Sequence, residues 1–172
     1  MAFSFDLTAM LTNLDRSIPE FMRLVAGAAY VMGVTFTASA LYHLKIYGEL
    51  RTMMSSQTGL KQPISYIIVA GMCFYLPTAI RTVLVTTFGY DNPLSYSEMG
   101  GGTMAIRVML QFIRLIGFIA FIRGWVMIAR ASQQSAQPGM FGKALIYILG
   151  GIFAINIVGT ARVVGNTLGI TF

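Results

Sequence analysis

Charged residues are scarce in this sequence. Asp, Glu, Lys and Arg make up 10% of its 172 residues, against about a quarter in an average soluble domain, while hydrophobic residues make up 56%. The single cysteine, Cys73, excludes an intramolecular disulfide, and the single histidine, His43, has no partner at metal-ligand spacing. These shortages predict an integral membrane protein and argue against an enzyme, a metal site or a catalytic cofactor.

Four apolar runs are present instead, at residues 24–42, 62–80, 104–130 and 144–161, and none contains Asp or Glu. Each is close to the roughly 20 residues that a helix needs to cross a bilayer, and each break between them is rich in polar or turn-forming residues. Ser17 and Glu20 form a capping box, which predicts that the first helix begins near Ile18. Pro77 predicts a kink in the second.

The segment before the first run has its own periodicity. Leu7, Met10, Leu11, Leu14 and Ile18 recur at steps of three and four, with polar residues between them. Such spacing favours an amphipathic helix over residues 1–17, lying on the bilayer surface or on a partner, over the alternative of a frayed tail. The predicted fold is therefore an all-α membrane protein of four hydrophobic helices, preceded by an amphipathic N-terminal helix.

The two halves of the chain resemble each other. "FMRLVAGAAYVMG" at 21–33 aligns without gaps with "FIRLIGFIAFIRG" at 112–124, and a weaker match pairs Tyr66 with Tyr147 and Arg81 with Arg162. This favours one helical hairpin duplicated in tandem, with units at 18–90 and 91–172. Two hairpins would place the first and third loops at one end, and both termini with the middle loop at the other.

Lysine and arginine do not orient these hairpins, because both ends carry five. The first and third loops contain Lys45, Arg51, Lys61, Arg130 and Lys143, and the other end contains Arg16, Arg23, Arg81, Arg107 and Arg162. Carboxylates gather at the second end, with only Glu49 at the first. We therefore expect the first set of basic residues to face the cytoplasm or, in an assembly, a lumen.

Four arginines lie in or beside apolar segments, namely Arg81, Arg114, Arg123 and Arg162. An arginine within a membrane pairs with a carboxylate or faces water or protein, and these runs offer no carboxylate. Loop carboxylates, backbone carbonyls and lipid phosphates remain as partners. The functional interpretation is that the four grip anionic phospholipid headgroups or another subunit. Ordinary snorkelling is the main alternative, with ion conduction or voltage sensing as a third.

Small residues at helical spacing predict where helices approach one another. They form columns on the first, third and fourth helices, namely Ala29 with Gly33, Ala120 with Gly124, and Gly165 with Gly169.

The stretch "LYHLKIYGELRTMMSSQTGLKQPISYIIVAGMCFYLPTAIRTVL" and the tail "IVGTARVVGNTLGI" carry a family resemblance. Chiefly through "GLKQPI", "YLPTAIRT" and the Gly-Thr-Ala-Arg ending, the chain resembles the IcmC/DotE and TraQ-like membrane proteins of type IVB secretion and IncI-type conjugation systems. The resemblance implies a non-enzymatic part of such an apparatus in the bacterial inner membrane, with other conjugation or secretion subunits as partners.

Within that setting the sequence favours a structural subunit that packs against copies of itself and membrane lipid. The expected assembly is a pilin-like filament of a conjugative pilus, so an extracellular pilus is a second location after assembly. The rivals are a fixed channel or scaffold of the secretion core, and a small independent transporter, disfavoured because no intramembrane carboxylate or broken-helix repeat is evident. No basic face is concentrated enough for sequence-specific nucleic acid.

Overall fold

The computed structural model describes residues 7–52, 59–89, 104–133 and 136–169. All regular structure in these ranges is helical, in the elements α1 (Leu7–Thr52), α2 (Lys61–Phe74), α3 (Leu76–Phe88), α4 (Met104–Ala131), α5 (Met140–Ile155) and α6 (Ile157–Thr167). The prediction of an all-α chain is confirmed. Two helices are long and apolar enough to cross a membrane, or up to four if each bent pair counts as one span, which fits the predicted membrane class.

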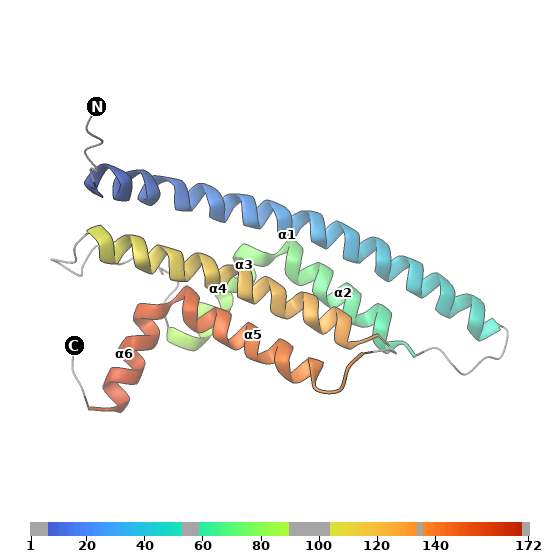
Figure 1. Ribbon diagram of the computed structural model, residues 1–172. Coiled ribbons are helices and arrows are strands. Elements are labelled where there is room, and N and C mark those ends of the chain that lie inside the picture. The colour runs from blue at the N-terminus through green and yellow to red at the C-terminus, as the bar shows by residue number, and fades with distance from the viewer. Residues whose placement is uncertain (1–6, 53–58, 90–103, 134–135, 170–172) are drawn as a thin grey trace.

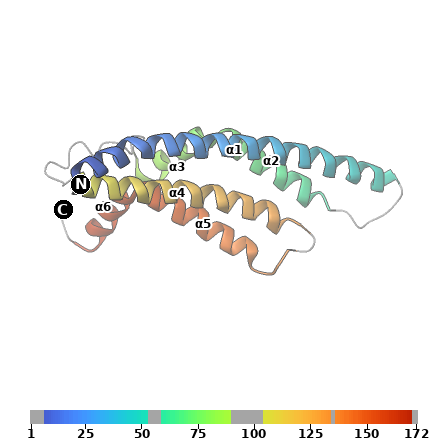
Figure 2. The ribbon, with the colours of Figure 1, turned by 45° about the horizontal axis from the view of Figure 1, so that its top comes forward.

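The helices form an elongated bundle (Figure 1). α2 packs beside α1, α5 packs beside α4, and α1 and α4 run side by side in the same direction. The beginnings of α1 and α4 lie at the same end of the bundle as α6, and α3 lies in that half of it. Turning the molecule by 45° keeps this arrangement (Figure 2). The other end is where α1 and α4 finish and where α2 and α5 begin.

α1 begins earlier than the sequence predicted. It is continuous from Leu7 to Thr52 and contains Pro19, so the predicted start near Ile18 is wrong. The Ser17 hydroxyl donates to the Asn13 carbonyl oxygen at 2.9 Å, one turn back, instead of capping a helix start. Ile18 is buried, so the apolar stripe of the preceding segment continues into the bundle. Residues 7–17 are thus the first turns of α1, and residues 1–6 lie outside the described residues.

Both second helices of the hairpins turn a sharp corner. α2 and α3 meet at 87° at Tyr75, and Pro77 stands in the first turn of α3, so the predicted kink is confirmed as a full corner. α5 and α6 meet at 92° at Asn156, so the prediction of an unbroken helix over residues 144–161 is wrong. The Asn156 side-chain oxygen accepts from the Gly159 amide at 3.2 Å, which caps α6 at its new start.

The two corners fall at matching places. The alignment that pairs Tyr66 with Tyr147 also places Tyr75 opposite Asn156. The first helices agree as well, because the Thr12 hydroxyl contacts the sulfur of Met104 and Ala29 shares a core cluster with Phe121, close to the register of the sequence alignment. The expectation that the chain lacks a broken-helix repeat is therefore wrong.

The core lies where α3 and α5 meet the long helices. Its larger cluster comprises Ala29, Leu76, Ile80, Leu84, Phe121, Ile122, Ile152 and Ile155. The buried face of α3, Leu76, Ile80 and Leu84, recurs every four residues, which is one side of a helix. The corner at Tyr75 therefore folds an amphipathic helix back against the bundle.

Glycines allow α4 and α5 to pack almost backbone to backbone. A Cβ added at Gly124 would lie 2.9 Å from the Ile148 amide nitrogen, and one at Gly117 would lie 2.7 Å from the Ile155 amide nitrogen. Gly124 was predicted as a packing residue, whereas Gly117 and its facing Gly151 were missed. The contact repeats at steps of four and three, through Gly117, Phe121 and Gly124, whereas the predicted columns of small residues repeat at steps of four alone.

The remaining small-residue predictions divide. Ala29 is fully buried, and a Cβ at Gly33 would lie 3.2 Å from the Phe74 ring, so this column does pack against α2. Ala120 is half-buried and Gly165 is buried. Gly169 is exposed with φ of +74°, so it ends α6 in the left-handed conformation and is not a packing residue.

Candidate functional site

The four predicted arginines do not form one cluster. Arg81 lies on α3 and Arg162 on α6, beyond the two corners, whereas Arg114 and Arg123 lie on α4. Arg114 is buried and the other three are exposed. Each position must therefore be assigned its own chemistry.

Arg114 is enclosed by protein. Its side chain is 7% exposed, and its Nε–H donates to the carbonyl oxygen of Ile155 at 3.3 Å. Ile155 is the last residue of α5, where the corner deprives carbonyls of their helical donors and where the helix dipole is negative. Backbone carbonyls were one of the partners that the sequence left open for this arginine. In this position Arg114 holds the corner and does not present itself to lipid.

Arg123 lies on the outer side of the close contact between α4 and α5. Its Cζ atom is 5.3 Å from the centre of the Tyr147 ring, at cation–π distance. The guanidinium is exposed, so its outer edge remains open to headgroups or a neighbouring chain. Binding of Arg123 to lipid or to another subunit therefore stays a prediction.

Arg81 lines a shallow hollow on α3. The hollow has a volume of about 300 Å³ and is lined by Thr78, Arg81, Thr82, Val85 and Thr86. The Thr86 hydroxyl donates to the Thr82 carbonyl oxygen at 2.8 Å. This face is opposite the buried face of α3, so a guanidinium and threonine hydroxyls share an open surface, which suits a phosphate. Arg162, the aligned residue, is exposed on α6.

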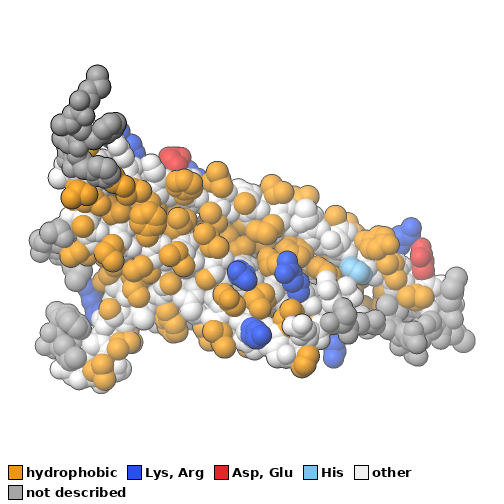
Figure 3. All heavy atoms as spheres, viewed as in Figure 1, with side chains coloured by type: hydrophobic (Ala, Val, Ile, Leu, Met, Phe, Trp, Pro, Cys, Tyr) orange, Lys and Arg blue, Asp and Glu red, His pale blue; other side chains and the backbone are white. Residues whose placement is uncertain are grey.

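The basic residues of the loop end are spread around the starts of α2 and α5. Lys61, Arg130 and Lys143 are exposed, and Lys45 forms an exposed ion pair with Glu49 at 3.7 Å. The side chain of Arg51 lies outside the described residues. Figure 3 shows hydrophobic side chains spread along the visible face, with a few charged groups among them. The N-terminal dipoles of α2 and α5 add positive potential at this end.

A polar network at the same end was missed by sequence reasoning. The Gln62 side-chain nitrogen lies 3.1 Å from His43 Nε2, the His43 and Tyr66 rings stack at 5.3 Å, and Gln133 Nε2 donates to the Tyr66 hydroxyl at 2.8 Å. The network joins α1 and α2 to the end of α4. The sequence does show these polar residues beside apolar runs. It does not show that they contact one another, because they lie far apart in the chain.

Comparisons with protein-family models, curated proteins and solved structures found no match for this chain. Within the described residues, no group of three His, Cys, Asp or Glu side chains could hold a metal ion. The fold defines a helical protein with two to four helices able to cross a membrane.

Proposed function

We propose that the chain is a non-enzymatic structural subunit of a conjugation or type IVB secretion apparatus that assembles with copies of itself and with lipid into a pilin-like filament. The observation that carries the proposal is the apolar surface left open along α1. Leu24 is 68% exposed, Val31 66% and Leu41 64%. Surfaces of this size on one long helix require a lipid or protein covering.

Helix lengths support a placement of four helices across the membrane. α2 and α5, at 14 and 16 residues, are about 21 and 24 Å long, short of the roughly 30 Å hydrocarbon core. An amphipathic helix lying in the interface sinks about 5–10 Å into it, which supplies the difference. In this arrangement α1, α2, α4 and α5 cross the bilayer as two tandem hairpins, while α3 and α6 lie in its plane.

That placement brings four of the exposed arginines close to lipid phosphates. Arg81 and Arg162 on the in-plane helices lie at headgroup depth, where phosphates are within reach of a guanidinium fork. Arg107 and Arg130 stand near opposite ends of α4, about 35 Å apart along its axis, and match the two headgroup layers. Anionic phospholipid is therefore the expected companion of the chain.

The length of α1 supports assembly beyond the bilayer. Its 46 residues extend about 69 Å, more than twice the hydrocarbon thickness. At its beginning Leu7 and Met10 remain 65% and 51% exposed. An apolar overhang of this kind suits a neighbouring copy, whose own α1 presents the same surface.

A fixed channel or scaffold in the inner membrane is the second candidate. The apolar overhang at the start of α1 favours it, because this surface also suits a different secretion subunit.

The aligned corners lend some support to a transporter, since broken helices at matching positions are typical of that class. Transporter breaks lie at the bilayer midplane. The α5–α6 corner lies beside Gly117 in the first half of α4, whereas Phe74, just before the α2–α3 corner, contacts Tyr30 midway along α1.

The test is to shear cells that express the intact apparatus, image the released material by electron cryo-microscopy and identify its main protein by mass spectrometry. Filaments built of this chain, with Arg81 and Arg162 against lipid density or a neighbouring copy, are the expected result. If the chain stays in the inner-membrane fraction while filaments consist of another protein, the filament proposal fails and the scaffold candidate replaces it.

A further inference from the structure

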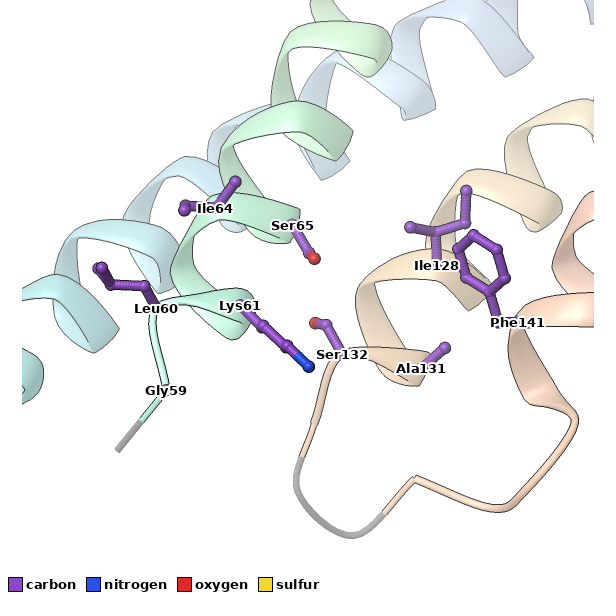
Figure 4. A pocket seen from close by; sticks show the side chains of 9 residues that line it. All are labelled: Gly59, Leu60, Lys61, Ile64, Ser65, Ile128, Ala131, Ser132 and Phe141. Carbon is purple, nitrogen blue, oxygen red and sulfur yellow. The ribbon is translucent and has the colours of Figure 1, made fainter. Parts of the chain in front are cut away.

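A cleft of about 710 Å³ opens between the two hairpins at the loop end of the bundle. It separates the beginning of α2 from the end of α4 and the beginning of α5 (Figure 4). Its lining comprises Gly59, Leu60, Lys61, Ile64, Ser65, Ile128, Ala131, Ser132 and Phe141. The volume lies within the range of sites that hold small molecules.

The polar groups of the cleft converge from opposite walls. Lys61 and Ser65 on α2 and Ser132 after α4 point toward one another across the space (Figure 4). The Ser132 hydroxyl donates to the Ala129 carbonyl oxygen at 2.7 Å, so its oxygen is left to accept from the lysine. No described carboxylate lies within ion-pair distance of Lys61. A cation that faces two hydroxyls across a cleft, without an acidic partner among the described residues, suits an anion.

The rest of the lining is apolar. Ile128 and Phe141 form the wall opposite Ser65 in Figure 4. Ile64 on α2 is 48% exposed and Phe141 is 57% exposed. Both line the cleft, so the bundle leaves their apolar side chains partly uncovered. A free inorganic anion would leave this apolar surface uncovered. The cleft thus combines a single cationic corner with an extended hydrophobic wall, which is the pattern of an amphiphile with an anionic head.

We propose that this cleft holds one anionic phospholipid from the leaflet at the loop end, lodged between the hairpins. Lys61 Nζ and the Ser65 hydroxyl donate to the headgroup phosphate, Ser132 steadies the lysine, and an acyl chain lies along Ile128 and Phe141. The inference rests on the proposed membrane placement and is independent of filament formation. It differs from headgroup contacts at Arg81 and Arg162, which lie at the opposite end of the bundle.

The experiment is native mass spectrometry of the full chain, extracted in mild detergent from membranes that contain phosphatidylglycerol. The wild type is expected to retain one phosphatidylglycerol. Lys61→Gln is expected to lower the retained fraction about tenfold, the effect of one charge-assisted hydrogen bond, while Lys61→Arg keeps most of it. Lys143→Gln is the matched control, because this exposed lysine lies at the same end of the bundle but outside the cleft.

A second variant fills the cleft without changing charge. Ala131→Phe places a ring in the lining and is expected to exclude the lipid, with unchanged far-ultraviolet circular dichroism showing that the helices persist. Equal losses in Lys61→Gln and Lys143→Gln would overturn the proposal, because the lipid would then respond to overall charge. Lipid retained in Ala131→Phe, or lipid displaced by inorganic phosphate alone, would overturn it too. So would an empty wild type that crosslinks through this cleft to a second copy.

Discussion

Arg114 on α4 donates to the carbonyl oxygen of Ile155, the last residue of α5, across the close contact between these two helices. The bond places the buried guanidinium where the helical ladder of α5 stops and its dipole is negative. An arginine in an apolar run therefore serves here to complete a broken helix. The same corner lies beside Gly117, whose missing side chain lets the two backbones meet.

Replacing Arg114 by leucine is expected to destabilise the protein. The substitution leaves the Ile155 carbonyl without this donor in an apolar interior, at a cost of about 1–3 kcal/mol. The check is thermal unfolding of the purified protein in detergent, with Arg107→Leu as the control, since Arg107 is exposed at the start of the same helix. Equal stabilities for Arg114→Leu and wild type would show that the bond is dispensable and that this arginine only snorkels.

Adjacent glycines on α5 are expected to respond differently to alanine. A Cβ at Gly151 would lie 2.7 Å from the Phe121 amide nitrogen and 2.8 Å from the Gly117 carbonyl oxygen, whereas one at Gly150 meets nothing within 4 Å. Gly151→Ala should cost about 1–3 kcal/mol because backbone cannot yield as a side chain does, and Gly150→Ala should be neutral or slightly stabilising. Unfolding of the two variants in detergent, by heat or by guanidinium chloride, measures the difference in stability. Similar values for both would contradict the close α4–α5 contact.

Asn156→Ala is expected to loosen α6 while leaving α5 intact. The change removes the acceptor for the Gly159 amide, and loss of an N-cap costs about 0.5–2 kcal/mol. Hydrogen–deuterium exchange should therefore rise in residues 157–167 and stay unchanged in residues 140–155. Asn156→Ser, which retains a capping oxygen, should restore most of the protection. Uniform exchange in both helices would mean that the corner does not depend on the asparagine.

Much of the fold was predictable because apolar length and composition respond to local rules. The bounds of α4 agree with the predicted run to within a residue. Pro77 predicts the corner between α2 and α3, since proline removes a helical donor. Asn156 is a weaker signal of a corner than Pro77, because asparagine keeps its backbone N–H and can also lie inside a helix. Its role as the N-cap of α6 shows only in the structure. The start of α1 was misjudged because Pro19 and the Ser17–Glu20 pair resemble a helix beginning, whereas the burial of Ile18 by other helices favours continuation.

The site was predictable only in its residue types. The sequence named Arg81, Arg114, Arg123 and Arg162 but could not separate them, since burial depends on contacts between helices distant in the chain. Arg114 finds its acceptor at Ile155, and that acceptor exists only because of the corner at Asn156. The cleft at Lys61 likewise needs two hairpins to form, so its lining residues carry no common local pattern.

Cysteine labelling distinguishes four membrane spans from two spans with re-entrant pairs. Cys73 is buried in the core and should not react with a membrane-impermeant maleimide in the folded protein, so single cysteines can be added to the natural chain. With four spans and cytoplasmic loops, Lys61→Cys and Lys143→Cys should react only after spheroplasts are lysed, whereas Arg107→Cys and Arg162→Cys should react in intact spheroplasts. The reason is that α2 and α5 then cross the bilayer and carry their two ends to opposite sides. The reverse pattern would keep four spans and invert the orientation. Reaction of Lys61→Cys and Arg107→Cys from one side, and of Lys143→Cys and Arg162→Cys from the other, would reject the hairpins as spanning units and leave α1 and α4 as the two spans.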